Sequence, residues 1–357
     1  MPRTIRLSLI AIPFLLLLCA PLAAAQAPFF SFTTPDDSVQ IRRLVEQYLT
    51  YSSRDTLDSN QQSAMMADEL GEWISKRSGA VPSLPRMTLG QVRPIRSDGS
   101  LAIVTATSDP EDVPMFGPVK TDWVFFTRLT DAGWRLSALR RQTGADAMIR
   151  TFRSLDSTTQ YPLALKKVIA RESAGILMSN DQLREHFNAH RAGFQTLAGH
   201  FHRRDSLYMM GRSDRVIIQL NNVGLEWGIA AQEVPQEAID EFMKMASPQQ
   251  KKYMEEQIAV AAKMRRYGMD TLQRVARRFG YSMERLDSAV SLMRDLHVNF
   301  GNSRLPWEGA VQFTIGGANE EAVGYLYSPK GEVPFLSSDE YFYLEDLGGG
   351  WWIFRAT

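Results

Sequence analysis

Two histidines separated by one helical turn are the residues whose spacing most suggests chemistry. His186 and His190 have the i, i+4 spacing that places two imidazoles on one side of a helix, where they can offer nitrogen ligands to a metal ion. His186 is followed by Phe187, so the glutamate of a zinc-protease helix is missing. At about 100° per residue, His190 falls between Phe187 and Phe194 inside an apolar stripe, and His186 lies at its margin. The pattern predicts that both histidines pack, with metal binding as the alternative.

Other catalytic and cofactor motifs are missing from the sequence. It contains no GxSxG elbow, no glycine-rich phosphate loop and no HExxH, and the only cysteine is Cys19. The acidic segment with Asp109, Glu111 and Asp112 offers oxygen ligands, but its prolines and spacing do not match a calcium-binding loop. We therefore predict no cofactor and no metal and a solvated loop at residues 109–118, and the sequence favours a non-catalytic protein while it leaves an enzyme open.

Residues 272–290 have the pattern of two helices that meet at Gly280, with arginines at 274, 277 and 278. Helix-turn-helix proteins that bind DNA share this spacing, but so do many ordinary helix pairs. The 40 basic residues are balanced by 40 acidic ones, so there is no polybasic surface to attract nucleic acid or anionic lipid. We expect no nucleic-acid partner.

The first 25 residues have the order of a secretory signal peptide. Arg3 and Arg6 precede an apolar run over residues 7–18, and Ala23-Ala24-Ala25 provide small residues for cleavage after Ala25. Bulky Leu18 stands before Cys19, where a lipoprotein signal requires a small residue. The sequence thus predicts export to the periplasm or the extracellular space, without a stable membrane anchor after cleavage and without disulfides.

The length and composition indicate a folded chain of two domains. About 330 residues would follow the leader, more than one core normally supports, and 44% hydrophobic with 22% charged residues is ordinary globular composition. Thr34-Pro35-Asp36-Asp37 predicts a helix start, and periodicity indicates the following elements. We expect helices over 36–54 and 60–76, strands over 89–95, 101–107, 119–129 and 134–140, and helices over 145–155 and 162–178.

The amino-terminal segments resemble the nuclear transport factor 2-like superfamily, which includes SnoaL-like and ketosteroid isomerase-like proteins. The resemblance is carried by IRRLVEQYLTYSSRD and WVFFTRLTDAGWRLSAL and covers residues 36–141. It implies a curved antiparallel sheet wrapped around the first helix to form a cone-shaped pocket. It places Tyr48 where isomerases have an oxyanion donor, while residues 79–87 lack the aspartate base. Candidate pocket residues are Tyr48, Tyr51, Trp123 and Phe125.

The carboxyl-terminal half predicts a second α+β domain. Asn180-Asp181 would cap a long helix, and strand patterns recur at 215–220, 224–230, 311–315, 322–327, 341–345 and 351–356. Four short helices are expected within 235–300, one starting at Ser247-Pro248, one over 270–280 and one at Ser282. FFTRLTDAGWRL aligns without a gap with FYLEDLGGGWWI, so each half ends on an aromatic hairpin and duplication of the domain stays open.

The predicted organisation is a leader (1–25), a cone-shaped domain of a helix and a curved antiparallel sheet (30–142), a helical connector (143–180), and a domain in which a long helix and a helical insertion (235–300) pack on an antiparallel sheet (181–357). The function expected from this sequence is binding of a small apolar molecule or of an envelope protein. An isomerase or hydrolase that uses the cone pocket is the alternative, and an interaction module that uses the helical block is a third possibility. The sequence does not specify the oligomeric state.

Overall fold

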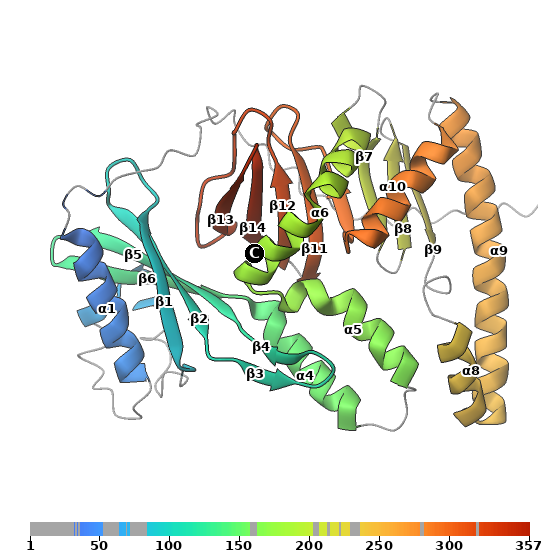
Figure 1. Cartoon of the computed structure of the whole chain (residues 1–357), viewed down its shortest axis with the longest axis horizontal. Helices are drawn as coiled ribbons and strands as arrows, with labels where there is room; N and C mark the ends of the chain where they lie inside the picture. Colours follow the sequence, from blue (N-terminus) through green and yellow to red (C-terminus); the bar gives the residue numbers. More distant parts are fainter. Residues whose placement is uncertain are drawn as a thin grey trace, which may run out of the picture.

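The computed structural model describes residues 32, 34, 36–52, 64–68, 70–71, 84–157, 163–202, 207–212, 215–220, 223–228, 236–278, 282–318 and 321–357. The fold is α+β, with helices packed on antiparallel sheets (Figure 1). The leader, most of the helix expected over 60–76 and Gly280 lie outside the described residues.

The amino-terminal domain packs one helix against a four-stranded antiparallel sheet, as the periodicity predicts. Helix α1 (Asp37–Ser52) crosses the sheet (Figure 1). The sheet has the order β1-β2-β5-β6. Its strands are β1 (Met87–Pro94), β2 (Leu101–Ser108), β5 (Asp122–Thr130) and β6 (Gly133–Arg141). Asp37 anchors the start of α1, because its carboxylate accepts hydrogen bonds from Thr34 N (3.1 Å) and Trp134 Nε1 (3.1 Å).

Both faces of this sheet are buried. Val104 and Phe125 point toward α1, whereas their neighbours Ile103, Val124 and Phe126 belong to the core of the second domain. Side chains alternate between the two faces of a strand, so a strand buried on both faces reads as a continuous apolar run. This explains the WVFF sequence in β5, and it joins the two domains through one core.

The proline-containing segment after β2 is a small hairpin rather than the expected loop. Strands β3 (Glu111–Val113) and β4 (Gly117–Val119) pair antiparallel. Val113 and Val119 turn inward and pack with Phe152 of α4 (Thr143–Ser157). The solvated-loop prediction is wrong because two inward-facing valines give the hairpin an apolar side to bury.

The predicted helical connector holds the domains together. Helix α5 (Leu163–Leu177) follows α4 and contacts strands β11 (Val311–Ala318) and β12 (Glu321–Tyr327) of the second domain. A Cβ atom on Gly175 of α5 would lie 2.1 Å from the carbonyl oxygen of Ile315, and one on Gly316 would lie 2.5 Å from the amide nitrogen of Ile176. The helix and strand therefore approach as closely as their backbones allow, which requires glycine at both positions.

The second domain is an eight-stranded antiparallel sheet with the order β13-β14-β12-β11-β10-β7-β8-β9 (Figure 1). Helix α6 (Asn180–His202) packs on it through the predicted stripe, with Leu183, Phe187, Phe194, Leu197 and Phe201 buried. Strands β7 and β10 were not predicted. The strands are β7 (Leu207–Arg212), β8 (Arg215–Leu220), β9 (Val223–Gly228), β10 (Phe300–Asn302), β11 (Val311–Ala318), β12 (Glu321–Tyr327), β13 (Tyr341–Gly348) and β14 (Trp351–Ala356).

The start of α6 differs from the expected Asn180-Asp181 cap. Ser179 Oγ accepts a hydrogen bond from Gln182 N (3.3 Å), and Gln182 Oε1 accepts one from Ser179 N (2.9 Å). This reciprocal pair is a capping box, so Ser179 is the cap and Asn180 is the first helical residue. The side chain of Asn180 is thereby released for a role in the interdomain site.

The helical block contains three described helices in place of the expected four. They are α8 (Gln236–Met245), α9 (Pro248–Arg278) and α10 (Met283–Asp295). The caps expected at Ser247 and Ser282 are confirmed by hydrogen bonds from Gln250 N and Arg285 N. The break expected at Asp270 is wrong, because α9 runs through it for 31 residues. No proline interrupts this stretch, and one glycine costs only about 1 kcal/mol in a helix interior.

The two aromatic hairpins are not topologically equivalent. In the first domain, strand β5 is the inner strand and pairs with β2, which leaves β6 at the edge. In the second domain, β14 is the inner strand and pairs with β12, which leaves β13 at the edge. A duplicated domain would keep the same inner strand, so this part of the topology favours convergence of two aromatic hairpins.

Candidate functional site

The structure brings the four candidate pocket residues together as packed side chains. Tyr48 is 2% exposed and Phe125 is fully buried, with their ring centroids 6.1 Å apart in an edge-to-face contact. Tyr51 packs against the same cluster, and the Arg141 guanidinium lies 4.9 Å from the Trp123 ring centroid. The two cavities described below are lined by none of these four residues.

The Tyr48 hydroxyl has no acid or base beside it in the described part of the chain. It makes no hydrogen bond with those residues, and burial alone raises its pKa to about 12. General base catalysis requires a group within hydrogen-bond reach. The isomerase alternative therefore has no described residue to supply its proton transfer.

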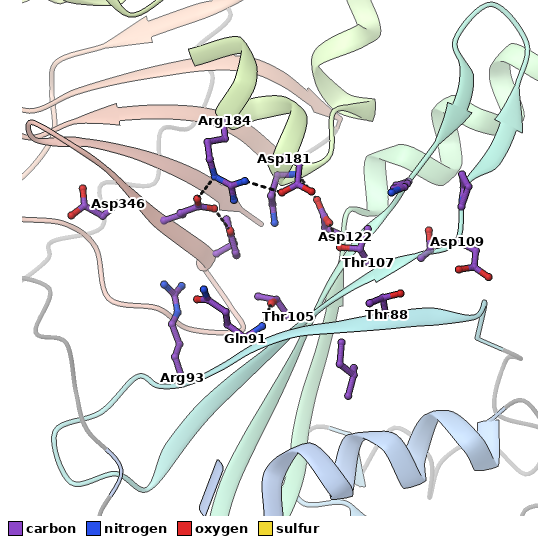
Figure 2. A pocket seen from close by; sticks show the side chains of 18 residues that line it. Thr88, Gln91, Arg93, Thr105, Thr107, Asp109, Asp122, Asp181, Arg184 and Asp346 are labelled. Atoms are coloured by element: carbon purple, nitrogen blue, oxygen red, sulfur yellow. Dashed lines mark hydrogen bonds and ion pairs between the residues drawn. The ribbon is translucent and has the colours of Figure 1, made fainter. Parts of the chain in front are cut away.

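A cleft of about 740 Å³ lies between the two domains. Figure 2 shows its walls: strands β1 and β2 on one side, and the first turn of α6 with β13 on the other. Its lining is rich in hydroxyl, amide and charged groups, and it includes Thr88, Gln91 and Thr107 from the first domain. The volume is in the range of small-molecule sites, about 300–1,000 Å³.

One end of the cleft is held by a buried ion pair between the domains. Asp122 accepts hydrogen bonds from Thr107 Oγ1 (2.8 Å) and from the backbone N–H of Asn180 (2.6 Å), and its Oδ2 lies 3.3 Å from Arg355 Nη2. Arg355 also donates to Asn180 Oδ1 (2.8 Å) and to the carbonyl oxygen of Met178 (2.7 Å). A carboxylate at the first residue of a helix is favoured by the helix dipole. Asp122 therefore fixes the start of α6 against the first sheet.

Burial and charge act in opposite directions on Arg355. Burial lowers the pKa of its guanidinium, and the adjacent Asp122 carboxylate raises it again. Arginine stays protonated even at such sites because its ordinary pKa is so high. The pair is thus a buried salt bridge whose charges have to remain together.

The opposite wall is a second network of charged side chains. Glu345 accepts hydrogen bonds from the Tyr343 hydroxyl and from Arg184 Nε (2.6 Å), and Arg184 Nη1 donates to Asp181 Oδ1 (2.8 Å; Figure 2). Burial raises the pKa of Tyr343, and the neighbouring Glu345 carboxylate raises it further. Tyr343 is therefore a neutral hydroxyl at physiological pH, and the carboxylate of Glu345 is held from both sides.

Arg93 connects the walls across the cleft. Its Nη2 donates to the carbonyl oxygen of Leu344 (2.5 Å), and its guanidinium lies 5.8 Å from the Tyr343 ring centroid. Its Nε is buried without a hydrogen-bond partner. Burial lowers the pKa of this guanidinium, while Tyr343 and Glu345 raise it.

Two charged side chains in the cleft remain uncommitted. Asp109 and Lys120 are exposed and make no side-chain hydrogen bond or ion pair with the described residues. They stand on adjacent segments, because Ser108 N donates to the carbonyl oxygen of Thr121 (2.9 Å). One negative and one positive charge are thus available to a ligand.

Sequence reasoning missed the residues of this cleft. Asp122 and Arg355 are 233 residues apart, so no local spacing connects them. The available signal was the type of residue in its context: Arg355 interrupts the apolar strand WWIFRA, and a charge in a buried strand requires a partner.

The histidine pair lies on α6, away from the cleft. His186 is half-buried and His190 is exposed, so the prediction that His190 packs in the apolar stripe is wrong. Leu296, which follows α10, packs on α6 at Gly193, whereas the His190 side chain in the preceding turn stays exposed. No three His, Cys, Asp or Glu side chains in the described ranges are arranged to hold a metal ion.

A second cavity of about 880 Å³ lies between the first sheet and the segment before β13. It has an exposed phenylalanine, Phe335, and an ion pair between Arg128 and Asp68 (3.0 Å) whose side chains are both about half exposed. Such exposed pairs contribute little energy and little fixed geometry. The first cleft has the more strongly organised polar groups.

Among the described helices, none has the length and apolar content needed to cross a membrane. No protein-family model matches the chain, and no curated protein shows significant similarity to it.

Proposed function

We propose that this chain is an exported binding protein whose ligand occupies the cleft between its two domains. The ligand is a small polar molecule with hydrogen-bond donors and acceptors and charges of both signs, such as a zwitterion. The observation that carries the proposal is the pair of fixed networks around Asp122 and Glu345, in a cleft that is also lined by the uncommitted Asp109 and Lys120.

Preorganisation supports binding at this place. Groups already held by hydrogen bonds lose little conformational freedom when a ligand arrives, so more of the contact energy appears as affinity. Asp122 and Glu345 are each held by several donors, and the threonines on β1 and β2 add hydroxyl groups. The ligand expected from the sequence was apolar, whereas the chemistry of the cleft favours a polar one.

Two parts of the proposal rest on sequence. Export and cleavage after Ala25 follow from the order of the leader. Membership of the amino-terminal domain in the nuclear transport factor 2-like superfamily follows from the motifs given above, and the helix-on-sheet arrangement agrees with it. In this proposal the cone serves as a scaffold, and the outer face of its sheet forms one wall of the site.

Native mass spectrometry of the protein purified from its own compartment tests this function. We expect a mature chain that begins at Gln26 and carries a retained small molecule. Thr88→Trp, which fills the cleft from its exposed wall, should abolish the adduct. Leu129→Trp places the same side chain at an exposed position outside the cleft and should retain it. An adduct that survives Thr88→Trp would contradict the proposal.

A second candidate function is docking of an envelope protein on the helical block. Met245, the last residue of α8, and Tyr253, in the first turns of α9, are both more than half exposed, and exposed apolar side chains that gather on one surface mark interaction sites. A photo-crosslinker at Tyr253 should then capture an envelope protein in cells, whereas one at exposed Val39 on α1 should not. Equal labelling from both positions would count against this function.

A further inference from the structure

His186 and His190 lie outside the cleft and have no role in the function proposed above. The two side chains stand one turn apart on α6, with ring centroids 4.7 Å apart. A third imidazole, His297, has its ring centroid 6.0 Å from that of His186. Because these rings lie so close together, the positions of their protons decide which nitrogen atoms can bind a ligand.

Hydrogen bonds determine the tautomer of His186. The Tyr325 hydroxyl donates its only proton to the carbonyl oxygen of Leu183 (2.8 Å). His186 Nδ1 lies 2.9 Å from the same hydroxyl oxygen, so Nδ1 has to be the donor. The proton of the neutral ring is therefore on Nδ1, and Nε2 carries a lone pair.

The tautomer of His190 follows in the same way. Its Nδ1 lies 2.9 Å from the carbonyl oxygen of His186, which can only accept, so Nδ1 donates and Nε2 again carries the lone pair. Histidines that ligate metals typically donate their other ring N–H to a carbonyl oxygen or a similar acceptor, which orients the ring. Both members of the pair have this supporting hydrogen bond.

The Nε2 atom of His186 is buried and lacks a hydrogen-bond partner. Buried polar atoms without partners are rare, and each one calls for an explanation, such as an unseen ion. An unpartnered ring nitrogen of this kind is the atom that a neutral imidazole offers to a metal ion.

We propose that His186 and His190 form a two-imidazole site for a divalent transition-metal ion of the zinc or copper class, bound through the two Nε2 atoms. Imidazole suits these ions, and water completes the coordination because no third protein ligand is arranged for it. His190 is exposed, so an ion can reach the pair from solvent. Tyr325 is a positioning residue that holds the His186 ring.

Isothermal titration of the metal-free full chain with Zn²⁺ tests the site. We expect one saturable site in the wild type and at least about a tenfold loss of affinity in His190→Ala, since even supporting groups cost 10–100-fold. His200→Ala removes a histidine of the same helix outside the pair and should leave binding unchanged.

Tyr325→Phe should weaken Zn²⁺ binding by about tenfold, because His186 loses the acceptor that orients it. Tyr341→Phe also removes a hydrogen-bonded hydroxyl from the same sheet and should have no effect on Zn²⁺ binding. With Cu²⁺ in place of Zn²⁺, electron paramagnetic resonance should show coupling to two imidazole nitrogens in the wild type and one in His190→Ala. No saturable heat, or equal affinity in the wild type and His190→Ala, would overturn the proposal.

Discussion

The space between α1 and the first sheet, which the resemblance interprets as a cone, and the cleft lined by β1, β2, α6 and β13 are two regions of the same molecule with opposite contents. In the cone, Tyr48 and Phe125 fill the space between α1 and the sheet. In the cleft, Asp122 and Glu345 are held in hydrogen-bonded networks around an open volume of about 740 Å³. Apolar side chains close a concave surface by packing, whereas charged groups that are held by partners keep such a surface open.

In this helix-on-sheet domain, the candidate site lies on the face of the sheet that is turned away from the helix. The inner face of the first sheet stabilises the domain, and its outer face contributes to the candidate site. A cone-like arrangement is therefore insufficient to locate a pocket, and the distribution of buried charge is the better guide.

The largest expected effect comes from emptying the cone. Phe125→Ala removes a fully buried ring from the cluster around α1 and should lower the free energy of unfolding by about 3–5 kcal/mol. Urea unfolding followed by tryptophan fluorescence measures this. Leu129→Ala, an exposed position on the same strand, should change stability by less than about 0.5 kcal/mol. A cost below about 1 kcal/mol for Phe125→Ala would mean that the cone is not packed.

Breaking the ion pair between Asp122 and Arg355 should lower the free energy of unfolding nearly as much as Phe125→Ala does. Asp122→Ala leaves Arg355 charged and unpaired in the interior, which typically destabilises a protein by about 3–5 kcal/mol. Asp112→Ala, at an exposed carboxylate of the same domain, is the control. Replacing both partners, as in Asp122→Leu with Arg355→Met, should restore part of the loss of unfolding free energy. If the double variant were less stable than Asp122→Ala, the unpaired charge would not be the cause.

The same substitution in the two regions should give different results. Tyr343→Phe removes a hydrogen bond to the Glu345 carboxylate and should lower the unfolding free energy by about 1.5–3 kcal/mol. Tyr48→Phe removes a hydroxyl that is not hydrogen-bonded to described residues, so its effect should stay within about 0.5 kcal/mol. Paired chemical denaturation curves check both. Equal losses of unfolding free energy in the two variants would contradict the distinction between the packed side chains around Tyr48 and the hydrogen-bonded network around Glu345.

The smallest expected effect is the contribution of His186 to the pH dependence of the unfolding free energy. Its folded-state pKa of about 4 lies below the ordinary value of 6.5, so the unfolded state binds the proton more readily. Stability is therefore complete above about pH 6.5 and falls as the pH decreases toward 4, by about 1–2 kcal/mol after a discount for partial exposure. Unfolding of metal-free protein between pH 7 and 5 should show this slope, and His186→Gln should flatten it. An unchanged slope in the variant would contradict the assignment.

The elements could be predicted from local sequence, because local chemistry specifies them. The stripe from Leu183 to Phe201 predicts α6, and the caps at Ser247 and Ser282 are where expected. Predictions failed where tertiary contacts determine whether a side chain is buried or exposed. Val113 and Val119 gain a buried side only because α4 lies beneath them, and His190 is exposed although its position within the α6 periodicity predicted packing.

The candidate site could not be predicted, because its residues come together from distant segments. Asp122 begins a strand, Asn180 begins a helix and Arg355 nearly ends the chain. Asp122 and Asn180 are unremarkable in their local context, Arg355 stands out only as a charge in an apolar strand, and the packing of the first sheet on the second domain unites them. The aromatic residues that the resemblance singled out as pocket residues lie together in the structure as packed core side chains.

Hydrogen–deuterium exchange is the most direct test of the central claim that the cleft, and not the cone, binds the ligand. The protein would be measured with and without the small-molecule fraction from its own compartment. We predict slower exchange in the cleft strands β1 (Met87–Pro94) and β13 (Tyr341–Gly348), with α1 (Asp37–Ser52) unchanged. Protection of α1 with no change in β1 and β13 would contradict this assignment and place the ligand in the cone.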